Sequence, residues 1–218
     1  MGKETIKETI KDTVMYKIGV DIPFTLDDIS LTLPNIKYST IKVNIKRMLD
    51  QGVIKKSKNG IYYLPKQQRV LKETILNTDD VITKKYIKDS DNHMIGYYSG
   101  INLARSLGFT TQTASVETIY SNLVADKKRI IKVQNQKFTI NAPRYKVRDD
   151  NYKLLQVLDI IHIFDKVSEI GREKALVIIK EYLKDIMLTK DELTSIVKSY
   201  PLKTQVAFYE IGVDHVIT

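Results

Sequence analysis

The first 65 residues constrain the fold most, because three helical patterns there precede a pattern typical of a β-hairpin. Ile6, Ile10, Val14 and Ile18 recur at every fourth residue, which predicts an amphipathic helix. Gly19 follows the last of these residues and is expected to end the helix.

Two further helices are predicted from their ends as well as from their periodicity. Thr25 followed by Asp28 is a variant of the capping box, which predicts a short helix that begins at Thr25 and closes before Pro34. The third helix is expected from about Lys37 to Gln51, because Gly52 supplies a C-terminal stop. Its apolar face consists of Tyr38, Ile41, Ile45 and Met48.

A β-hairpin is predicted directly after the third helix. The β-rich runs 53–57 and 61–64 flank Asn59 and Gly60. Asn-Gly between two strands is typical of a type I′ turn, because both central residues of that turn need a positive φ. Three helices followed by a hairpin form the element order of a winged helix-turn-helix, which we therefore predict for residues 1–66.

Basic residues are concentrated in the same part of the chain. The protein has 35 Lys and Arg against 26 Asp and Glu, for a formal net charge of +9. Residues 37–69 contain nine Lys and Arg against Asp50 alone, so this segment carries about +8 of the total. Such a concentration indicates a surface for a polyanion, and a solvated lysine-rich face is the alternative.

The polar face of the third helix and the hairpin together predict a surface for DNA. In a winged helix the third helix enters the major groove and the wing lies along the backbone. Hydroxyl and amide groups can read base edges, a valine can meet a thymine methyl, and cations bind phosphates. The predicted DNA-binding residues are Ser39, Thr40, Lys42, Val43, Asn44, Lys46, Arg47, Lys55, Lys56, Lys58 and Asn59. Two alternatives stay open: Val43 as a surface valine without a contact, and a winged helix that binds only protein.

Residues 67–218 predict a second, larger domain of mixed α and β structure, so the expected fold class is α+β. The polar junction 66–69 marks the expected domain boundary. The expected elements are helices at 70–76, 81–88 and 101–107, a strand at 115–122, and a hairpin of strands 128–133 and 138–140 that turns at Asn135-Gln136. Further helices are expected at 151–167, at 172–187 and from Lys190 onward, so that about 151–218 is all helical. The apolar helix at 151–167 is expected at the centre of the core, with a covering partner as the alternative.

The sequence contains no pattern of catalytic or cofactor-binding residues, so we expect neither an enzyme nor a bound metal or cofactor. His93, His162 and His215 lack the spacing of metal ligands, and His162 is expected to be a core residue with satisfied polar atoms. Ser99 lacks the surrounding glycines of a nucleophile elbow. The absence of cysteine, of a secretory signal and of a long apolar run predicts a cytoplasmic protein without a membrane partner.

The most characteristic segment of the second domain is Tyr-Ser-Gly-Ile-Asn-Leu-Ala-Arg-Ser-Leu-Gly-Phe-Thr-Thr-Gln, at residues 98–112. Together with Gly-Ile-Tyr-Tyr-Leu-Pro at 60–65 and Val-Glu-Thr-Ile-Tyr at 116–120, it resembles the AbiEi-type antitoxins of type IV toxin–antitoxin systems. The resemblance covers roughly residues 5–165. The residues of the second-domain signature are Tyr98, Ser99, Gly100, Leu107, Gly108, Thr111 and Gln112.

This resemblance implies a transcriptional autorepressor that acts in phage defence by abortive infection. Its winged helix would bind double-stranded DNA at repeats in its own promoter, and its larger domain would counteract a nucleotidyltransferase toxin, directly or functionally. A winged-helix transcription regulator whose C-terminal domain senses a ligand is the alternative function.

Overall fold

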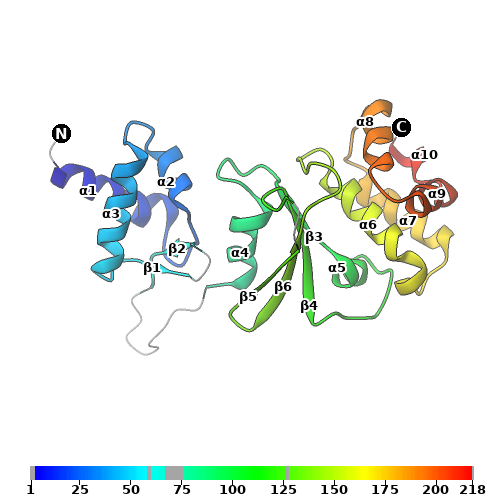
Figure 1. The fold of residues 1–218 in the computed structure, drawn as a ribbon, viewed down its shortest axis with the longest axis horizontal. Helices are drawn as coiled ribbons and strands as arrows, with labels where there is room; N and C mark the ends of the chain where they lie inside the picture. Colours follow the sequence, from blue (N-terminus) through cyan, green and yellow to red (C-terminus); the bar gives the residue numbers. More distant parts are fainter. Residues whose placement is uncertain (1–2, 58–59, 67–75, 126–127, 218) are drawn as a thin grey trace. The chain divides into compact units, whose positions relative to one another are not determined.

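The structure is a computed structural model that describes residues 3–57, 60–66, 76–125 and 128–217. Its fold class is α+β, as predicted. The chain divides into two compact units, Met1–Asn92 and His93–Thr218, and each unit contains its own sheet (Figure 1).

The first unit begins with the three predicted helices. Helix α1 (Lys3–Asp12) continues into a π-helical segment, η1 (Thr13–Ile18), which ends at Gly19 with a φ of +101°. The expected first helix is therefore two elements, because its hydrogen-bond spacing widens after Asp12. Helices α2 (Leu26–Thr32) and α3 (Tyr38–Asp50) follow.

The capping box at the start of α2 is confirmed. The Asp28 backbone N–H donates to the Thr25 hydroxyl at 3.3 Å, and the Thr25 backbone N–H donates to the Asp28 carboxylate at 2.7 Å. Both donors would otherwise lack an intrahelical partner, so the pair fixes where α2 begins.

The predicted hairpin is present as a short antiparallel pair, β1 (Lys55–Lys56) and β2 (Tyr62–Tyr63). The Ser57 N–H donates to the Ile61 carbonyl at 2.7 Å, and the Gly60 N–H donates to the Ser57 carbonyl at 3.2 Å. Asn59, the other central residue of the predicted type I′ turn, lies outside the described residues. Gly60 still needs glycine's freedom, because its φ is +77°.

Strand β2 is also paired on its other side. Phe24 and Tyr62 exchange two backbone hydrogen bonds of 2.8 Å, and Val20 forms a parallel bridge with Leu64. The segment before α2 therefore extends the small sheet. The core beneath it consists of Ile10, Val14, Phe24, Ile29, Ile41, Ile45, Met48 and Ile54.

The first unit continues beyond the expected boundary at 66/67, as far as Asn92. It includes α4 (Thr78–Ile82) and the π-helical segment η2 (Thr83–Ile87), which agree with the helix expected at 81–88. The ammonium group of Lys84 in η2 lies 2.5 Å from the Asp28 carboxylate of α2. Most of the helix expected at 70–76 lies outside the described residues.

The second unit is built on a four-stranded sheet in the order β3–β4–β6–β5. These strands span Gly96–Ser99 (β3), Val116–Ser121 (β4), Arg129–Val133 (β5) and Gln136–Asn141 (β6). Strand β4 runs parallel to β6 and antiparallel to β3, and the β5–β6 pair is the second predicted hairpin. Its turn falls one residue earlier than predicted, because Val133 pairs with Gln136.

Helices flank this sheet in the described part of the second unit. They are α5 (Gly100–Ser106), α6 (Tyr152–Val167), α7 (Arg172–Leu183), α8 (Lys190–Lys198) and α9 (Leu202–Ile211), and the short α10 (Asp214–Ile217) follows them. The helical region expected from Lys190 onward is present as α8, α9 and α10. Pro201 separates α8 from α9, and Gly212, with a φ of +84°, ends α9.

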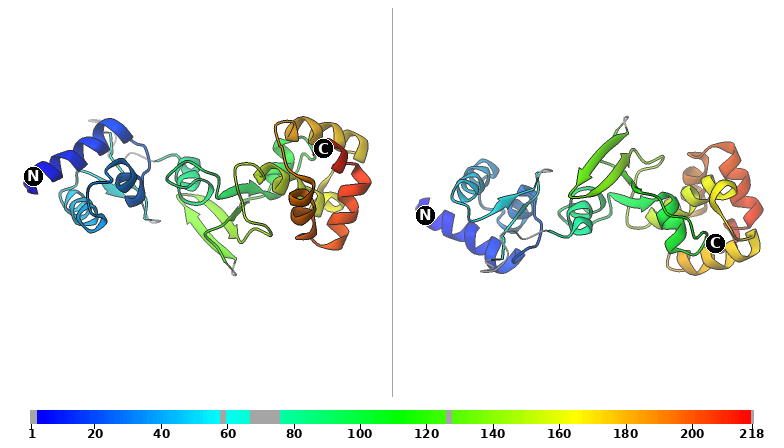
Figure 2. Two further views of the ribbon diagram at one scale, coloured as in Figure 1. Left: turned by 90° about the horizontal axis from the view of Figure 1, so that it is seen from above. Right: turned by 90° about the horizontal axis from the view of Figure 1, so that it is seen from below.

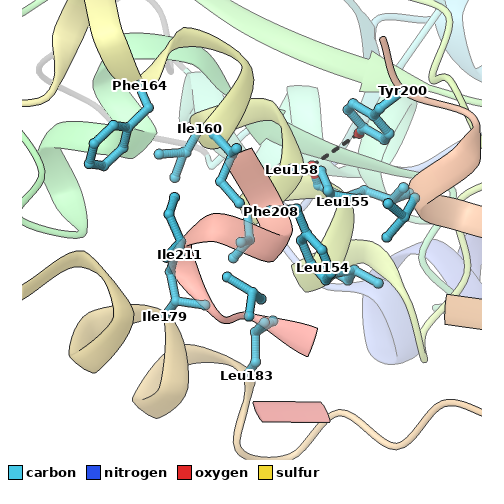
Figure 3. Close-up of a cluster of buried hydrophobic side chains, with 14 of the residues drawn as sticks. Leu154, Leu155, Leu158, Ile160, Phe164, Ile179, Leu183, Tyr200, Phe208 and Ile211 are labelled. Carbon is cyan, nitrogen blue, oxygen red and sulfur yellow. Dashed lines mark hydrogen bonds between the residues drawn. The ribbon is translucent and has the colours of Figure 1, made fainter. Parts of the chain in front are cut away.

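Helix α6 lies at the centre of the second unit, as predicted, between the sheet and the later helices (Figures 1 and 2). Ten of its side chains are buried. Figure 3 shows Leu154 and Leu158 of α6 in one cluster with side chains of α7 and α9. None of the described helices is both long and apolar enough to cross a membrane.

Candidate nucleic-acid interface

Helix α3 presents a largely polar and basic face to solvent, opposite the buried residues Ile41, Ile45 and Met48. Ile41, Ile45 and Met48 are at most 1% exposed. At 3.6 residues per turn, the opposite side of the helix points away from the core. The outer face of α3, as defined here, consists of the exposed residues Ser39, Lys42, Val43, Lys46 and Arg47.

Two of the α3 residues predicted to contact DNA are not fully exposed. Thr40 is only partly exposed, at the edge of the outer face. Asn44 is 5% exposed, and its side-chain amide donates to the Thr40 carbonyl at 2.9 Å. Asn44 follows Ile41 by three residues and therefore shares the buried side of the helix. The prediction that Asn44 presents its amide to a base edge is thus corrected.

The cations on the outer face of α3 are Lys42, Lys46 and Arg47. Among the described residues, no ion pair involves Lys42, Lys46 or Arg47. The first turn of α3 contains no acidic residue, so the partial positive charge of the helix N-terminus adds to the same field. Asp50 is an acidic residue at the C-terminal end of this helix.

The lysines of the β1–β2 hairpin begin at Lys55, five residues after the last residue of α3. Lys55 is partly exposed, and the exposed Lys56 holds its ammonium group 5.5 Å from the centre of the Tyr62 ring. Met48 of α3 and Ile54 before β1 are buried in the same core, which fixes the connection between the two elements. Lys58 and Asn59 lie outside the described residues.

A hollow of about 260 Å³ borders the outer face of α3 on the side of α1. It is lined by Ile6, Ser39, Thr40, Val43, Asn44 and Arg47. Val43 is 48% exposed and shares this hollow with Ile6, so the helix carries a small apolar depression between hydroxyl groups and a guanidinium group. A depression of this kind is suited to an apolar group such as a thymine methyl.

In the second unit, the signature residues Tyr98 and Ser99 anchor strand β3 to helix α6. The Ser99 hydroxyl donates to the Asp159 carboxylate at 2.9 Å, and both residues are buried. The Gln156 amide donates to the Tyr98 carbonyl at 2.8 Å. Tyr200 completes the network, because its hydroxyl lies 3.1 Å from the Asp159 carboxylate. The same hydroxyl donates to the Leu155 carbonyl at 3.2 Å (Figure 3).

Position 100 requires glycine for two reasons, its positive φ and the lack of room for a Cβ atom. Its φ is +79°, and a Cβ atom there would lie 3.1 Å from the Thr118 hydroxyl oxygen. Gly108 also has a positive φ, +84°, at the end of α5. Both glycines of the signature are therefore explained by the path of the chain.

The last part of the signature fixes the loop after α5. Thr111 donates both its backbone N–H and its hydroxyl to Glu169, each at 3.0 Å to one carboxylate oxygen. Leu107 packs partly buried against the core of the second unit, whereas Gln112 is exposed. The signature residues thus connect β3, α5 and the α6–α7 loop, and they do not gather on one exposed surface.

The buried carboxylate of Asp159 was not predicted as a site, although the sequence carries a signal for it. Asp159 interrupts an otherwise apolar run in α6, and its partners Ser99 and Tyr200 are each at least 40 residues away. Burial raises the pKa of Asp159 from 3.8 to about 6, while hydrogen bonds from Ser99 and Tyr200 and the charge of Arg144 lower it in part.

This pKa shift predicts how stability changes with pH. Because the folded-state pKa lies above the unfolded one, the native protein loses stability as the pH rises from about 4 to about 6. Replacing Asp159 with Asn removes this ionisation. The unfolding free energy of the wild type should fall between pH 4 and pH 7, whereas that of the variant should lack this fall. Subtracting the wild-type value from the variant value at each pH should therefore give a difference that is larger at pH 7 by on the order of 2 to 3 kcal/mol. Urea unfolding at both pH values measures it, and a pH-independent difference would contradict the burial of a charged Asp159.

The histidines do not form a site. His162 is exposed, so its expected place in the core was wrong, although its Nδ1 lies 2.8 Å from the hydroxyl of the buried Thr204. The Nδ1 of His93 lies 2.6 Å from the Asp149 carboxylate. Within the described ranges, no three His, Cys, Asp or Glu side chains are grouped as a metal site requires.

Comparisons with known proteins do not identify a family for this chain. No protein-family model matches the chain, and neither a curated protein nor a solved structure shows significant similarity to it.

Proposed function

We propose that residues 1–66 form a winged helix that binds double-stranded DNA, and that the protein is a transcriptional regulator. The proposal rests on the outer face of α3. This face is exposed and contains three cations, and none of them forms an ion pair with a described residue. A major-groove helix needs these features, because base edges are read by short polar side chains and phosphates are bound by cations.

The hairpin supports the same proposal. Strand β2 is fixed between β1 and the bridged residues Val20 and Phe24, so β1 and its lysines extend from a small three-part sheet. In winged helices a hairpin of this kind lies along the DNA backbone. We assign Lys55 and Lys56 to phosphate contacts, and Lys58 to the same role from its place in the sequence.

The wing is tested by replacing Lys55, Lys56 and Lys58 together with Ala. Binding to a duplex from the region upstream of the gene is measured by fluorescence anisotropy over a series of salt concentrations. The log–log slope should become shallower by about 0.9 for each lost phosphate contact. Sequence preference should persist, because phosphate contacts carry no base information.

A matched control removes the same charge from the second unit. Lys174, Lys180 and Lys198 are exposed on α7 and α8, and their replacement with Ala should leave the salt slope unchanged. If the salt slope of the wing variant is unchanged, or if the slope of the control variant falls by the same amount, the wing lysines do not contact DNA.

We further propose that the protein is the antitoxin of a type IV toxin–antitoxin system and represses its own promoter. This proposal rests on the resemblance of residues 98–112 to AbiEi-type antitoxins, and the comparisons add nothing to it. A nucleotidyltransferase encoded beside the gene would support it. Growth inhibition by that enzyme should be relieved when the protein is coexpressed, and persistent inhibition despite normal expression would contradict it.

A further inference from the structure

Helix α9 carries an apolar stripe on the face that does not enter the core. Its inner face buries Thr204, Phe208 and Ile211. On the other side Leu202, Val206 and Tyr209 are 74%, 47% and 52% exposed. These residues are four and three positions apart, so they form one continuous row on the helix surface.

An open hollow of about 370 Å³ runs beside this row. Its apolar floor is formed by Leu202, Val206 and Ala207, and each end carries one ion pair. Lys203 lies 2.8 Å from Asp165 of α6, and Arg172 of α7 lies 2.8 Å from Glu210. The hollow is therefore an apolar strip between two neutral pairs of charges.

We infer that this surface binds the same surface of a second copy of the chain. Each ion pair has no net charge, so the rim attracts neither a uniformly acidic nor a uniformly basic partner. Lys203 and Glu210 are seven residues apart and lie in one row along α9. An antiparallel copy of α9 therefore places Lys203 of each chain opposite Glu210 of the other, and the charges alternate around the contact.

The side chains near the centre of this arrangement suit a two-fold axis. The midpoint between positions 203 and 210 falls at Val206 and Ala207, so these residues meet their own counterparts. The small side chain of Ala207 allows the two helices to approach closely, and Leu202 of one chain comes within a turn of Tyr209 of the other. A contact between identical patches closes on itself and forms a dimer.

The absence of cysteine from the chain allows a direct test by disulfide crosslinking. Val206→Cys should form a crosslinked dimer under mild oxidation, because a disulfide requires Cα atoms within about 7 Å. Val177, at 69% exposed on α7, lies outside the stripe and is the matched position. Val177→Cys should remain uncrosslinked, and equal crosslinking at both positions would overturn the proposal.

Sedimentation velocity of the full-length protein over a range of concentrations gives the second readout. The wild type and Val177→Glu should sediment with twice the mass of one chain, and Val206→Glu with the mass of one chain. Circular dichroism checks that both variants fold. A monomeric wild type, as expected if another part of the same chain covers the stripe, would overturn the inference, and so would a dimeric Val206→Glu. The readouts are crosslinking and mass, so they are independent of DNA binding.

Discussion

Replacing Lys42, Lys46 and Arg47 together with Ala is expected to weaken binding to duplex DNA by on the order of a hundredfold at physiological salt, because each lost contact costs about 1 kcal/mol or more. All three side chains are exposed on the outer face of α3, so their removal leaves the core of the first unit intact. Fluorescence anisotropy with a labelled upstream duplex measures the loss.

Unlike the wing variant, the α3 variant should also lose sequence preference. The outer face is proposed to enter the major groove, where Arg and Lys read guanine edges as well as binding phosphates. The ratio of specific to non-specific affinity should therefore fall. If affinity decreases no more than in the variant of Lys174, Lys180 and Lys198, the assignment of α3 as the groove-reading helix is wrong.

The second large effect is expected in the core of the second unit, where Leu158→Ala should lower the unfolding free energy by about 2 to 5 kcal/mol. Leu158 is completely buried on α6, among side chains from α7 and α9 (Figure 3). Truncation removes burial and leaves a cavity that the surrounding helices can close only in part. Chemical denaturation monitored by circular dichroism measures the change.

Val177→Ala serves as the control for this change. Val177 is 69% exposed on α7, so its truncation should alter stability by less than about 0.5 kcal/mol. A comparable loss in both variants would contradict the central position of α6. The Leu158 variant should retain DNA binding at temperatures where the first unit stays folded, because that unit has its own core.

Local signals in the sequence predicted the elements that depend on neighbouring residues. The Thr25–Asp28 box predicted the start of α2, apolar periodicity predicted α3, and a run of apolar residues predicted α6. Each of these signals depends on residues close together in the sequence, so contacts with distant parts of the chain do not change it. The β5–β6 hairpin was predicted for the same reason, although its turn moved by one residue.

The errors arise where distant contacts decide the structure. Strand β3 was not recognised at Gly96–Ser99, because four residues with a glycine at the start give a weak pattern until β4 pairs with them. Helical periodicity placed Asn44 on the flank of the exposed side, but its side chain is buried and donates to the Thr40 carbonyl. The network around Asp159 joins residues far apart in the chain, which periodicity cannot reveal.

The central claim is that the outer face of α3 contacts duplex DNA, and thiol labelling tests it most directly. The chain has no cysteine, and Val43 is 48% exposed in the middle of that face, so Val43→Cys provides one reactive thiol at the proposed contact. We predict that a duplex from the upstream region slows alkylation of this thiol but leaves Val177→Cys unaffected. Equal alkylation of Val43→Cys with and without saturating duplex would contradict the claim.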